Sequence, residues 1–367
     1  MPASHRRRTR RRTRGLTAAL AALATAPAVL TGAAASASTG SAGAAELLSR
    51  SDGAAQASAL EYWTPERMAA ALPASADVDA AALAPAPASG AGAADTASGD
   101  PQPPADAVRT LAAEGLPSVV RRQRGTADVV TGDAVSVATP WRGEPAVTPK
   151  IGRLYFTQGG LPYECSASSV RSGNESVVVT AGHCLTERGR TSENVIYVPG
   201  LDGAAEPYGR WPAVRTFTTA EWLQEDQETP AALNHDVGFV VVGRHDGATL
   251  ADTTGALDIA FGAALDRVTV FGYPAAGRSG DGYTLQHCTG WRFPDAGGTS
   301  DHGTLCDMGG GSSGGPWLSG FDPVVGTGTV TSVVSFSYSA APERLYGPRL
   351  GDVERALHEQ AAAVPVP

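Results

Sequence analysis

Three short segments of the chain carry the residue types needed for nucleophilic catalysis. Ser313 lies in residues 311–316 (GSSGGP), His183 ends the run 180–183 (TAGH), and Asp236 lies in residues 234–237 (NHDV). A serine hydroxyl becomes nucleophilic when a neutral imidazole accepts its proton, and a buried carboxylate holds that imidazole in the correct tautomer. We therefore predict Ser313 as nucleophile, His183 as base and Asp236 as orienting acid in an acyl-transfer reaction.

The glycines around Ser313 fit the same chemistry. A residue without Cβ lets the backbone turn its N–H toward a developing oxyanion. We expect the oxyanion hole to be formed by the N–H groups of Gly311 and Ser313.

Apolar runs flank the base and the acid. Residues 177–180 (VVVT) precede His183 and residues 237–242 (VGFVVV) follow Asp236, so both side chains are expected at the ends of buried strands. Short strand patterns continue along the chain at 152–156, 176–180, 195–198, 237–242, 268–272, 283–286, 316–318 and 329–336. This density predicts an all-β fold of two six-stranded Greek-key barrels with the active site between them.

The end of the chain has a helical pattern. Asp352 opens a segment in which Val353, Ala356 and Leu357 recur at helical spacing. We expect a C-terminal helix that packs on the second barrel.

Between Ile151 and Leu357 the chain resembles the chymotrypsin-like peptidases, and within them the bacterial V8-like (glutamyl endopeptidase type) secreted branch. The resemblance rests on the three segments above, on Cys184 beside His183, and on the turn 271–274 (FGYP). It implies a serine endopeptidase that acts on protein or peptide substrates through an acyl-enzyme. It also implies that Ser335, Phe336 and Ser337 form the strand that binds the substrate.

The same resemblance pairs Cys165 with Cys184, which leaves Cys288 for Cys306. Each disulfide would close a loop of about twenty residues and stabilise the fold by about 3 kcal/mol in the chain-entropy model. An even number of cysteines fits an exported protein, because exported thiols are normally oxidised.

Substrate preference depends on the pocket before Ser313. Asp307 has the spacing of the carboxylate that attracts Lys or Arg in the trypsin branch, but it could instead cap backbone amides beside Cys306. Val334 stands where glutamate-specific relatives commonly have a histidine, and His302 could reach the pocket from another loop.

The N-terminal part indicates export and processing. Arginines between residues 6 and 14, an apolar run from 16 to 30 and the small residues 35–37 (ASA) predict a signal peptide over residues 1–37. Residues 38–145 are expected to be a pro-segment and linker, and residues 146–367 the peptidase domain of a secreted, extracellular monomer.

Within residues 38–145, residues 62–68 (YWTPERM) resemble a pro-segment element of secreted actinobacterial relatives. Residues 73–104 are rich in Ala, Pro and Gly and are predicted to be a linker, followed by a short helix at 105–114 and a basic trimming site at 121–124. A disordered spacer without a role in folding is the alternative. Ser312 replaces the aspartate of the animal digestive enzymes, so activation by an N-terminal ion pair is not expected.

Composition limits the other possibilities. The net charge of −9 argues against a nucleic-acid partner, and no run after the signal would span a membrane. No zinc-type spacing of Cys and His occurs, so we expect no metal and no cofactor. Two alternatives stay open: a catalytically silent protease-fold binding module, and a serine esterase with the order Ser, acid, His, completed by Asp322 or Asp352 and His358.

Overall fold

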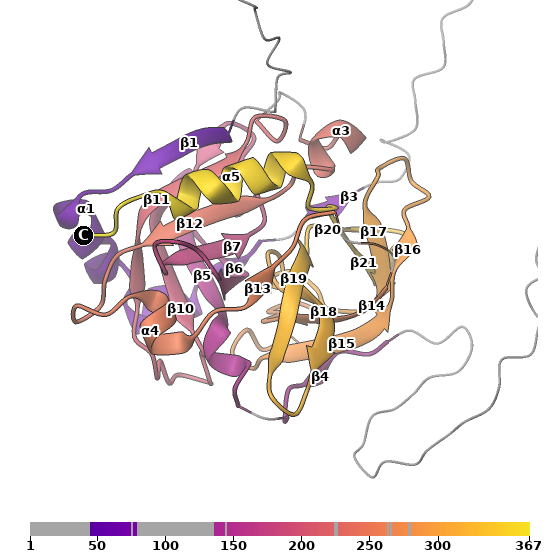
Figure 1. Cartoon of the computed structure of the whole chain (residues 1–367), viewed down its shortest axis with the longest axis horizontal. Helices are drawn as coiled ribbons and strands as arrows, with labels where there is room; N and C mark the ends of the chain where they lie inside the picture. The colour runs from indigo at the N-terminus through magenta and orange to yellow at the C-terminus, as the bar shows by residue number, and fades with distance from the viewer. Residues whose placement is uncertain are drawn as a thin grey trace, which may run out of the picture. The chain divides into compact units, whose positions relative to one another are not determined.

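The computed structural model describes residues 45–74, 76–78, 136–143, 145–223, 227–262, 264, 266–277 and 280–367. Strands predominate in this part of the chain (Figure 1). None of its helices is long and apolar enough to cross a membrane. The predicted signal peptide, the helix at 105–114 and the basic site at 121–124 lie outside the described residues.

Six strands form a first barrel that closes on itself. They are β5 (Ile151–Gln158), β6 (Leu161–Val170), β7 (Val177–Thr180), β10 (Glu193–Pro199), β11 (Trp211–Thr219) and β12 (Gly238–Val242). All neighbours are antiparallel in the order β11-β10-β5-β6-β7-β12, and β12 pairs back onto β11. Every residue of β5, β7 and β12 is buried, because one face lines the barrel and the other is covered from outside.

A second barrel follows, built from two sheets. The first contains β14 (Arg267–Gly272), β15 (Gln286–Trp291), β18 (Pro316–Asp322) and β19 (Thr327–Val333), flanked by β13 (Asp258–Ile259) and β4 (Thr139–Pro140). The second contains β16 (Phe293–Pro294), β17 (His302–Leu305), β20 (Phe336–Tyr338) and β21 (Ala341–Gly347). Its core gathers Val268, Val270, Trp317, Val334 and Leu345. The predicted two-barrel fold is confirmed.

The expected strand at 283–286 is wrong except for its last residue. Tyr283 and Thr284 donate their backbone N–H groups to the Asp281 carboxylate, which makes a turn of these residues, and β15 begins at Gln286.

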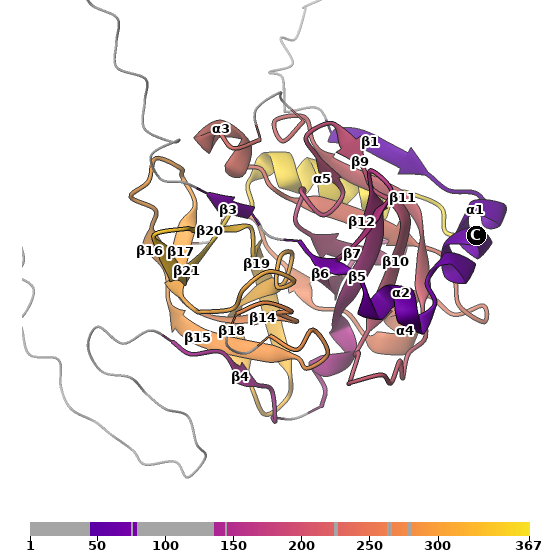
Figure 2. The same cartoon turned by 180° about the vertical axis from the view of Figure 1, so that it is seen from behind.

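Residues before the two barrels dock on the first one. β1 (Ala45–Arg50) adds to the edge of β11, and α1 (Gly53–Tyr62) and α2 (Pro65–Ala69) follow it (Figure 2). Trp63, 1% exposed, joins these helices to the barrel: its ring packs against Tyr155 and its indole N–H donates to the Asn194 carbonyl at 2.6 Å.

The predicted linker is wrong at its start, because residues from Pro73 onward take part in two short strands. β2 (Leu72–Pro73) pairs in parallel with β6, and β3 (Ala76–Val78) pairs in parallel with β20. Backbone hydrogen bonds to strands of the barrels hold this segment, so its Ala- and Pro-rich composition gave no signal of order.

The C-terminal helix α5 (Asp352–Ala362) is present, but it packs on the first barrel and not on the second (Figure 1). Glu354, Leu357 and Ala361 form its buried face over β11 and β12. The Glu354 carboxylate contributes to this position, since it accepts from the Gly351 N–H and lies 2.7 Å from His235 Nδ1 in the loop before β12.

The remaining elements are short. They are η1 (Thr148–Lys150), β8 (Thr186–Glu187), β9 (Arg190–Thr191), α3 (Pro230–Leu233) and α4 (Leu250–Thr254). Of these, α3 matters for the site because Asp236 lies in the short segment between α3 and β12.

Candidate active site

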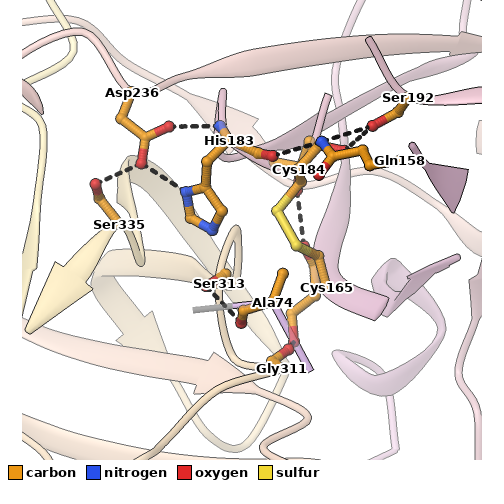
Figure 3. Close-up of a disulfide and its surroundings, with 12 residues drawn as sticks. Ala74, Gln158, Cys165, His183, Cys184, Ser192, Asp236, Gly311, Ser313 and Ser335 are labelled. Carbon is orange, nitrogen blue, oxygen red and sulfur yellow. Dashed lines mark hydrogen bonds and ion pairs between the residues drawn. A yellow bond between two sulfur atoms is a disulfide. The ribbon is translucent and has the colours of Figure 1, made fainter. Parts of the chain in front are cut away.

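His183 and Asp236 meet at the edge of the first barrel (Figure 3). His183 Nδ1 lies 2.8 Å from Asp236 Oδ2, and the His183 backbone N–H donates to Asp236 Oδ1 at 2.8 Å. The carboxylate is fully buried and the imidazole is 3% exposed. Two bonds from one carboxylate fix both the ring and the backbone of His183, which sets its tautomer with a proton on Nδ1.

Tight packing brings the two residues together. A Cβ at Gly182 would lie 2.9 Å from the Trp222 ring and 3.0 Å from Asp236 Oδ1, so only glycine fits between them. The Gln158 amide donates to the His183 carbonyl at 3.0 Å and holds the end of the β7 segment. Neither Gln158 nor Trp222 has a sequence signal that marks it as part of the site.

The environment of His183 changes its proton affinity. Burial lowers the pKa of His183, but the charge of Asp236 and its hydrogen bond outweigh burial, so that this pKa lies above its ordinary value. The imidazole therefore takes up a proton readily.

Ser313 comes from the second barrel, in the loop before β18. Gly311 and Gly314 in this loop have φ of 90° and 79°, in the region that favours glycine. A Cβ at Gly314 would lie 2.1 Å from Thr180 Oγ1 and 2.4 Å from the Ser166 carbonyl, so the loop passes close against the first barrel.

Ser166 in β6 fastens this loop to the first barrel, a role that the sequence did not reveal. Its hydroxyl donates to the Gly311 carbonyl at 2.8 Å and accepts from the Tyr273 N–H at 2.8 Å, while its N–H donates to the Ser313 carbonyl at 2.7 Å. Ser312, which lies between Gly311 and Ser313, donates its hydroxyl to the Gly309 carbonyl at 2.7 Å.

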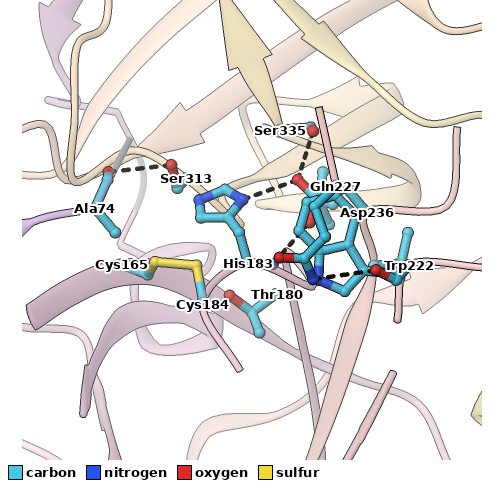
Figure 4. Close-up of polar contacts among 12 residues, drawn as sticks. Ala74, Cys165, Thr180, His183, Cys184, Trp222, Gln227, Asp236, Ser313 and Ser335 are labelled. Carbon is cyan, nitrogen blue, oxygen red and sulfur yellow. Dashed lines mark hydrogen bonds and ion pairs between the residues drawn. A yellow bond between two sulfur atoms is a disulfide. The ribbon is translucent and has the colours of Figure 1, made fainter. Parts of the chain in front are cut away.

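Ser313 faces the imidazole, but its hydroxyl is bonded elsewhere. In Figure 4 the His183 ring lies between Asp236 and Ser313. Ser313 Oγ donates to the Ala74 carbonyl at 3.2 Å, and the Gly311 N–H donates to the same oxygen at 2.9 Å. His183 Nε2 is buried without a hydrogen-bond partner among the described residues.

Both expected disulfides are formed. Cys165–Cys184 links β6 to the residue after His183, and Cys288–Cys306 links β15 to the segment after β17. Among the described residues, the one group with metal-ligand spacing is Cys165, His183 and Cys184, and its two sulfurs are joined to each other. A disulfide sulfur is not a thiolate ligand.

The predicted substrate strand, residues 335–337, begins beside Asp236. The Ser335 hydroxyl donates to Asp236 Oδ2 at 2.5 Å, so this side chain helps to hold the Asp236 carboxylate in place. Phe336 and Ser337 belong to β20, where Phe336 packs with Tyr338 and Tyr346.

The predicted pocket residues take structural partners. Asp307, half-buried, accepts from the Ala138 N–H at 2.7 Å. His302 lies in β17, where burial and then the Arg292 charge lower its pKa to about 4. Val334 is buried among apolar side chains of the second barrel.

Solved structures identify the family. Protease Anisep from Arthrobacter nicotinovorans matches with 36% identity and a TM-score of 0.54, over 60% of this chain and 99% of its own. The thermostable serine protease AL20 from an extremophilic microorganism matches with 33% identity and a TM-score of 0.54, over 60% of this chain and 100% of its own. The chain belongs to the chymotrypsin-like serine proteases.

This protease is a hydrolase of peptide bonds. A Glu endopeptidase structure matches it more distantly, with 19% identity and a TM-score of 0.49, over 64% of this chain and 100% of its own, so membership of the V8-like branch stays a prediction. Neither a protein-family model nor a curated protein matches the chain.

Proposed function

We propose that the protease is a secreted serine endopeptidase that cleaves proteins or peptides through an acyl-enzyme formed on Ser313. The observation that supports this proposal is the buried pair of His183 and Asp236, joined at 2.8 Å, with Ser313 on the other side of the imidazole.

In the proposed reaction, His183 Nε2 accepts the Ser313 proton as Oγ attacks the substrate carbonyl carbon. The N–H groups of Gly311 and Ser313 stabilise the oxyanion. His183 then gives the proton to the leaving amine, and water, activated by the same nitrogen, releases the acid. The Asp236 carboxylate stabilises the imidazolium between these steps, and the Ser335 hydroxyl donates a hydrogen bond to this carboxylate.

We further propose the domain organisation in which residues 1–37 are a signal peptide, residues 38–145 a pro-segment with linker and residues 146–367 the peptidase, active as a monomer. Residues 136–143 contact the second barrel through the Thr139–Pro140 strand and the hydrogen bond from Ala138 to Asp307. Activating cleavage before Ser136 would leave these contacts intact.

Labelling with a fluorophosphonate probe tests the proposal. Processed wild-type protein should be labelled at Ser313 and should cleave peptides, whereas Ser313→Ala should fold but lose about a million-fold in kcat. His183→Ala should lose as much, and the double variant scarcely more, because the residues act as a unit. If no form of the chain, full-length, processed or variant, reacts with the probe or cleaves peptides, the silent binding module is supported instead.

A further inference from the structure

A segment of the chain itself lies between the two barrels. It consists of Leu72–Ala74 and Ala76–Val78 and is called the cleft strap here. Its first part pairs with Tyr163 and Glu164 of β6 in the first barrel, and its second part pairs with Phe336–Tyr338 of β20 in the second (Figure 2). The strap thus crosses from one barrel to the other at the proposed site.

The centre of the strap binds the proposed catalytic groups. The Ala74 carbonyl oxygen accepts from the Gly311 N–H at 2.9 Å and from Ser313 Oγ at 3.2 Å, while the Ala74 N–H donates to the Glu164 carbonyl at 3.0 Å. The Ser313 hydroxyl therefore donates its hydrogen bond to the Ala74 carbonyl and not to His183 Nε2, which has no partner among the described residues (Figures 3 and 4).

The strap runs parallel to both strands that it pairs with, β6 and β20. A peptide that ran the opposite way through the same cleft would pair antiparallel with both strands, in the geometry whose hydrogen bonds are perpendicular to the strands and somewhat more stable.

Contacts at both ends of the strap anchor it. Val78, 5% exposed, packs in an apolar cluster with Phe336, Tyr338 and Tyr346, and its carbonyl accepts from the Ser339 N–H at 3.1 Å. Before the strap, β1 and the buried Trp63 hold the preceding residues on the first barrel.

From these contacts we propose that the cleft strap is an intramolecular inhibitor that occupies the substrate cleft in the reverse direction and is not cleaved there. The proposal rests on the proposed function, because it takes Ser313 and His183 as nucleophile and base. The strap fills the oxyanion position with an unreactive carbonyl and removes the hydrogen bond that would make Ser313 nucleophilic. Cutting the chain after the strap leaves its contacts in place, so activity requires that the strap departs.

The rate at which a fluorophosphonate labels Ser313 in the full chain measures whether the strap is closed. Val78→Ser removes one buried aliphatic side chain from the strap, which should open it and raise the labelling rate about tenfold or more. Ala74→Pro removes the N–H bonded to Glu164 and should act in the same direction. Val324→Ser, the same change at a valine that is 73% exposed, is the control and should label like wild type.

A synthetic peptide with the sequence of residues 70–78 should slow the labelling of Val78→Ser again, and mass spectrometry should find neither peptide nor chain cut after Ala74. Equal labelling rates of wild type, Val78→Ser and Ala74→Pro would overturn the strap proposal alone, as would cleavage after Ala74. If no form of the chain reacts at Ser313, the proposed function is wrong and the strap proposal falls with it.

Discussion

The hydroxyl of Ser166 in the first barrel donates a 2.8 Å hydrogen bond to the carbonyl of Gly311 in the second. The Ser166 hydroxyl oxygen also accepts from the Tyr273 N–H, so this buried side chain joins its own strand β6 to the backbone at Gly311 and at Tyr273. Gly311 has φ of 90°, in the region that favours glycine, and the bond from Ser166 fixes the orientation of its carbonyl. Ser166 is thus a positioning residue for the proposed oxyanion hole.

We expect Ser166→Ala to lower kcat about 10²-fold with little change in KM, since a displaced oxyanion donor affects the transition state more than substrate binding. Ser169→Ala is the matched control, because Ser169 lies in the same strand and bonds to the Gly255 carbonyl away from the site. Steady-state kinetics of the processed enzyme measure both. If the role of Ser166 is purely structural, Ser166→Ala lowers the free energy of unfolding and leaves kcat unchanged, as the Ser169→Ala control does.

The pH dependence of activity should report on His183. Only the neutral imidazole accepts the Ser313 proton, and Asp236 raises the pKa of His183, so kcat/KM should rise with pH through a midpoint above about 6.5. In Asp236→Asn the raising charge is lost while burial still lowers this pKa. The midpoint should move to lower pH, and kcat should fall about 10⁴-fold.

A pH–rate profile of wild type and Asp236→Asn measures this shift. A midpoint that is unchanged in the variant would show that Asp236 does not control the ionisation of His183.

The elements that carry the proposed catalytic residues could be predicted from the sequence because their flanks carry the signal. Apolar runs beside His183 and Asp236 became the buried strands β7 and β12, and Gly311 and Gly314 beside Ser313 took up positive φ. Residue type and local spacing were sufficient there.

The strap and the position of α5 could not be predicted in the same way. Backbone bonds to β6 and β20 order the strap, and these do not depend on the side-chain pattern of Leu72–Ala74. The position of α5 depends on contacts with distant residues, among them the contact of Glu354 with His235, 119 residues away in the sequence. Such pairings join residues that are far apart in the sequence, so no local sequence pattern predicts them.

Asp301 should destabilise the fold at neutral pH. It is 1% exposed, neither carboxylate oxygen has a hydrogen-bond partner among the described residues, and it borders a cavity of about 370 Å³. Burial, and then the charges of Asp236, Asp295 and Glu354, raise its pKa well above the ordinary value. Since the folded state holds this proton more tightly than the unfolded state, stability falls as pH rises from about 4 toward that raised pKa.

Asp301→Asn should therefore raise the free energy of unfolding at pH 7 by about 1–3 kcal/mol, with a difference that vanishes near pH 4. Urea unfolding in the Ser313→Ala background, which prevents autolysis, measures it. Asp295→Asn is the control: its carboxylate accepts from Tyr338, Thr299 and Gly297, so the change should destabilise. A gain that persists unchanged at pH 4 would exclude ionisation of Asp301 as the cause.

Asp307 has a structural role in the fold, and we expect it to have no role in substrate specificity. Its carboxylate accepts from the Ala138 N–H at 2.7 Å and so ties residues 136–143 to the second barrel. Asp307→Ala leaves that N–H without its acceptor, and we expect a loss of about 1–3 kcal/mol in the free energy of unfolding with an unchanged cleavage preference. Asp322→Ala, at a carboxylate that caps the turn of Val324, is the control for the loss of a backbone cap.

Cleavage of a peptide library by the processed enzyme separates the structural role of Asp307 from a role in specificity. A preference for Lys or Arg that is present in wild type and lost in Asp307→Ala would assign this carboxylate to the substrate pocket, because a buried carboxylate discriminates strongly for a guanidinium or ammonium group.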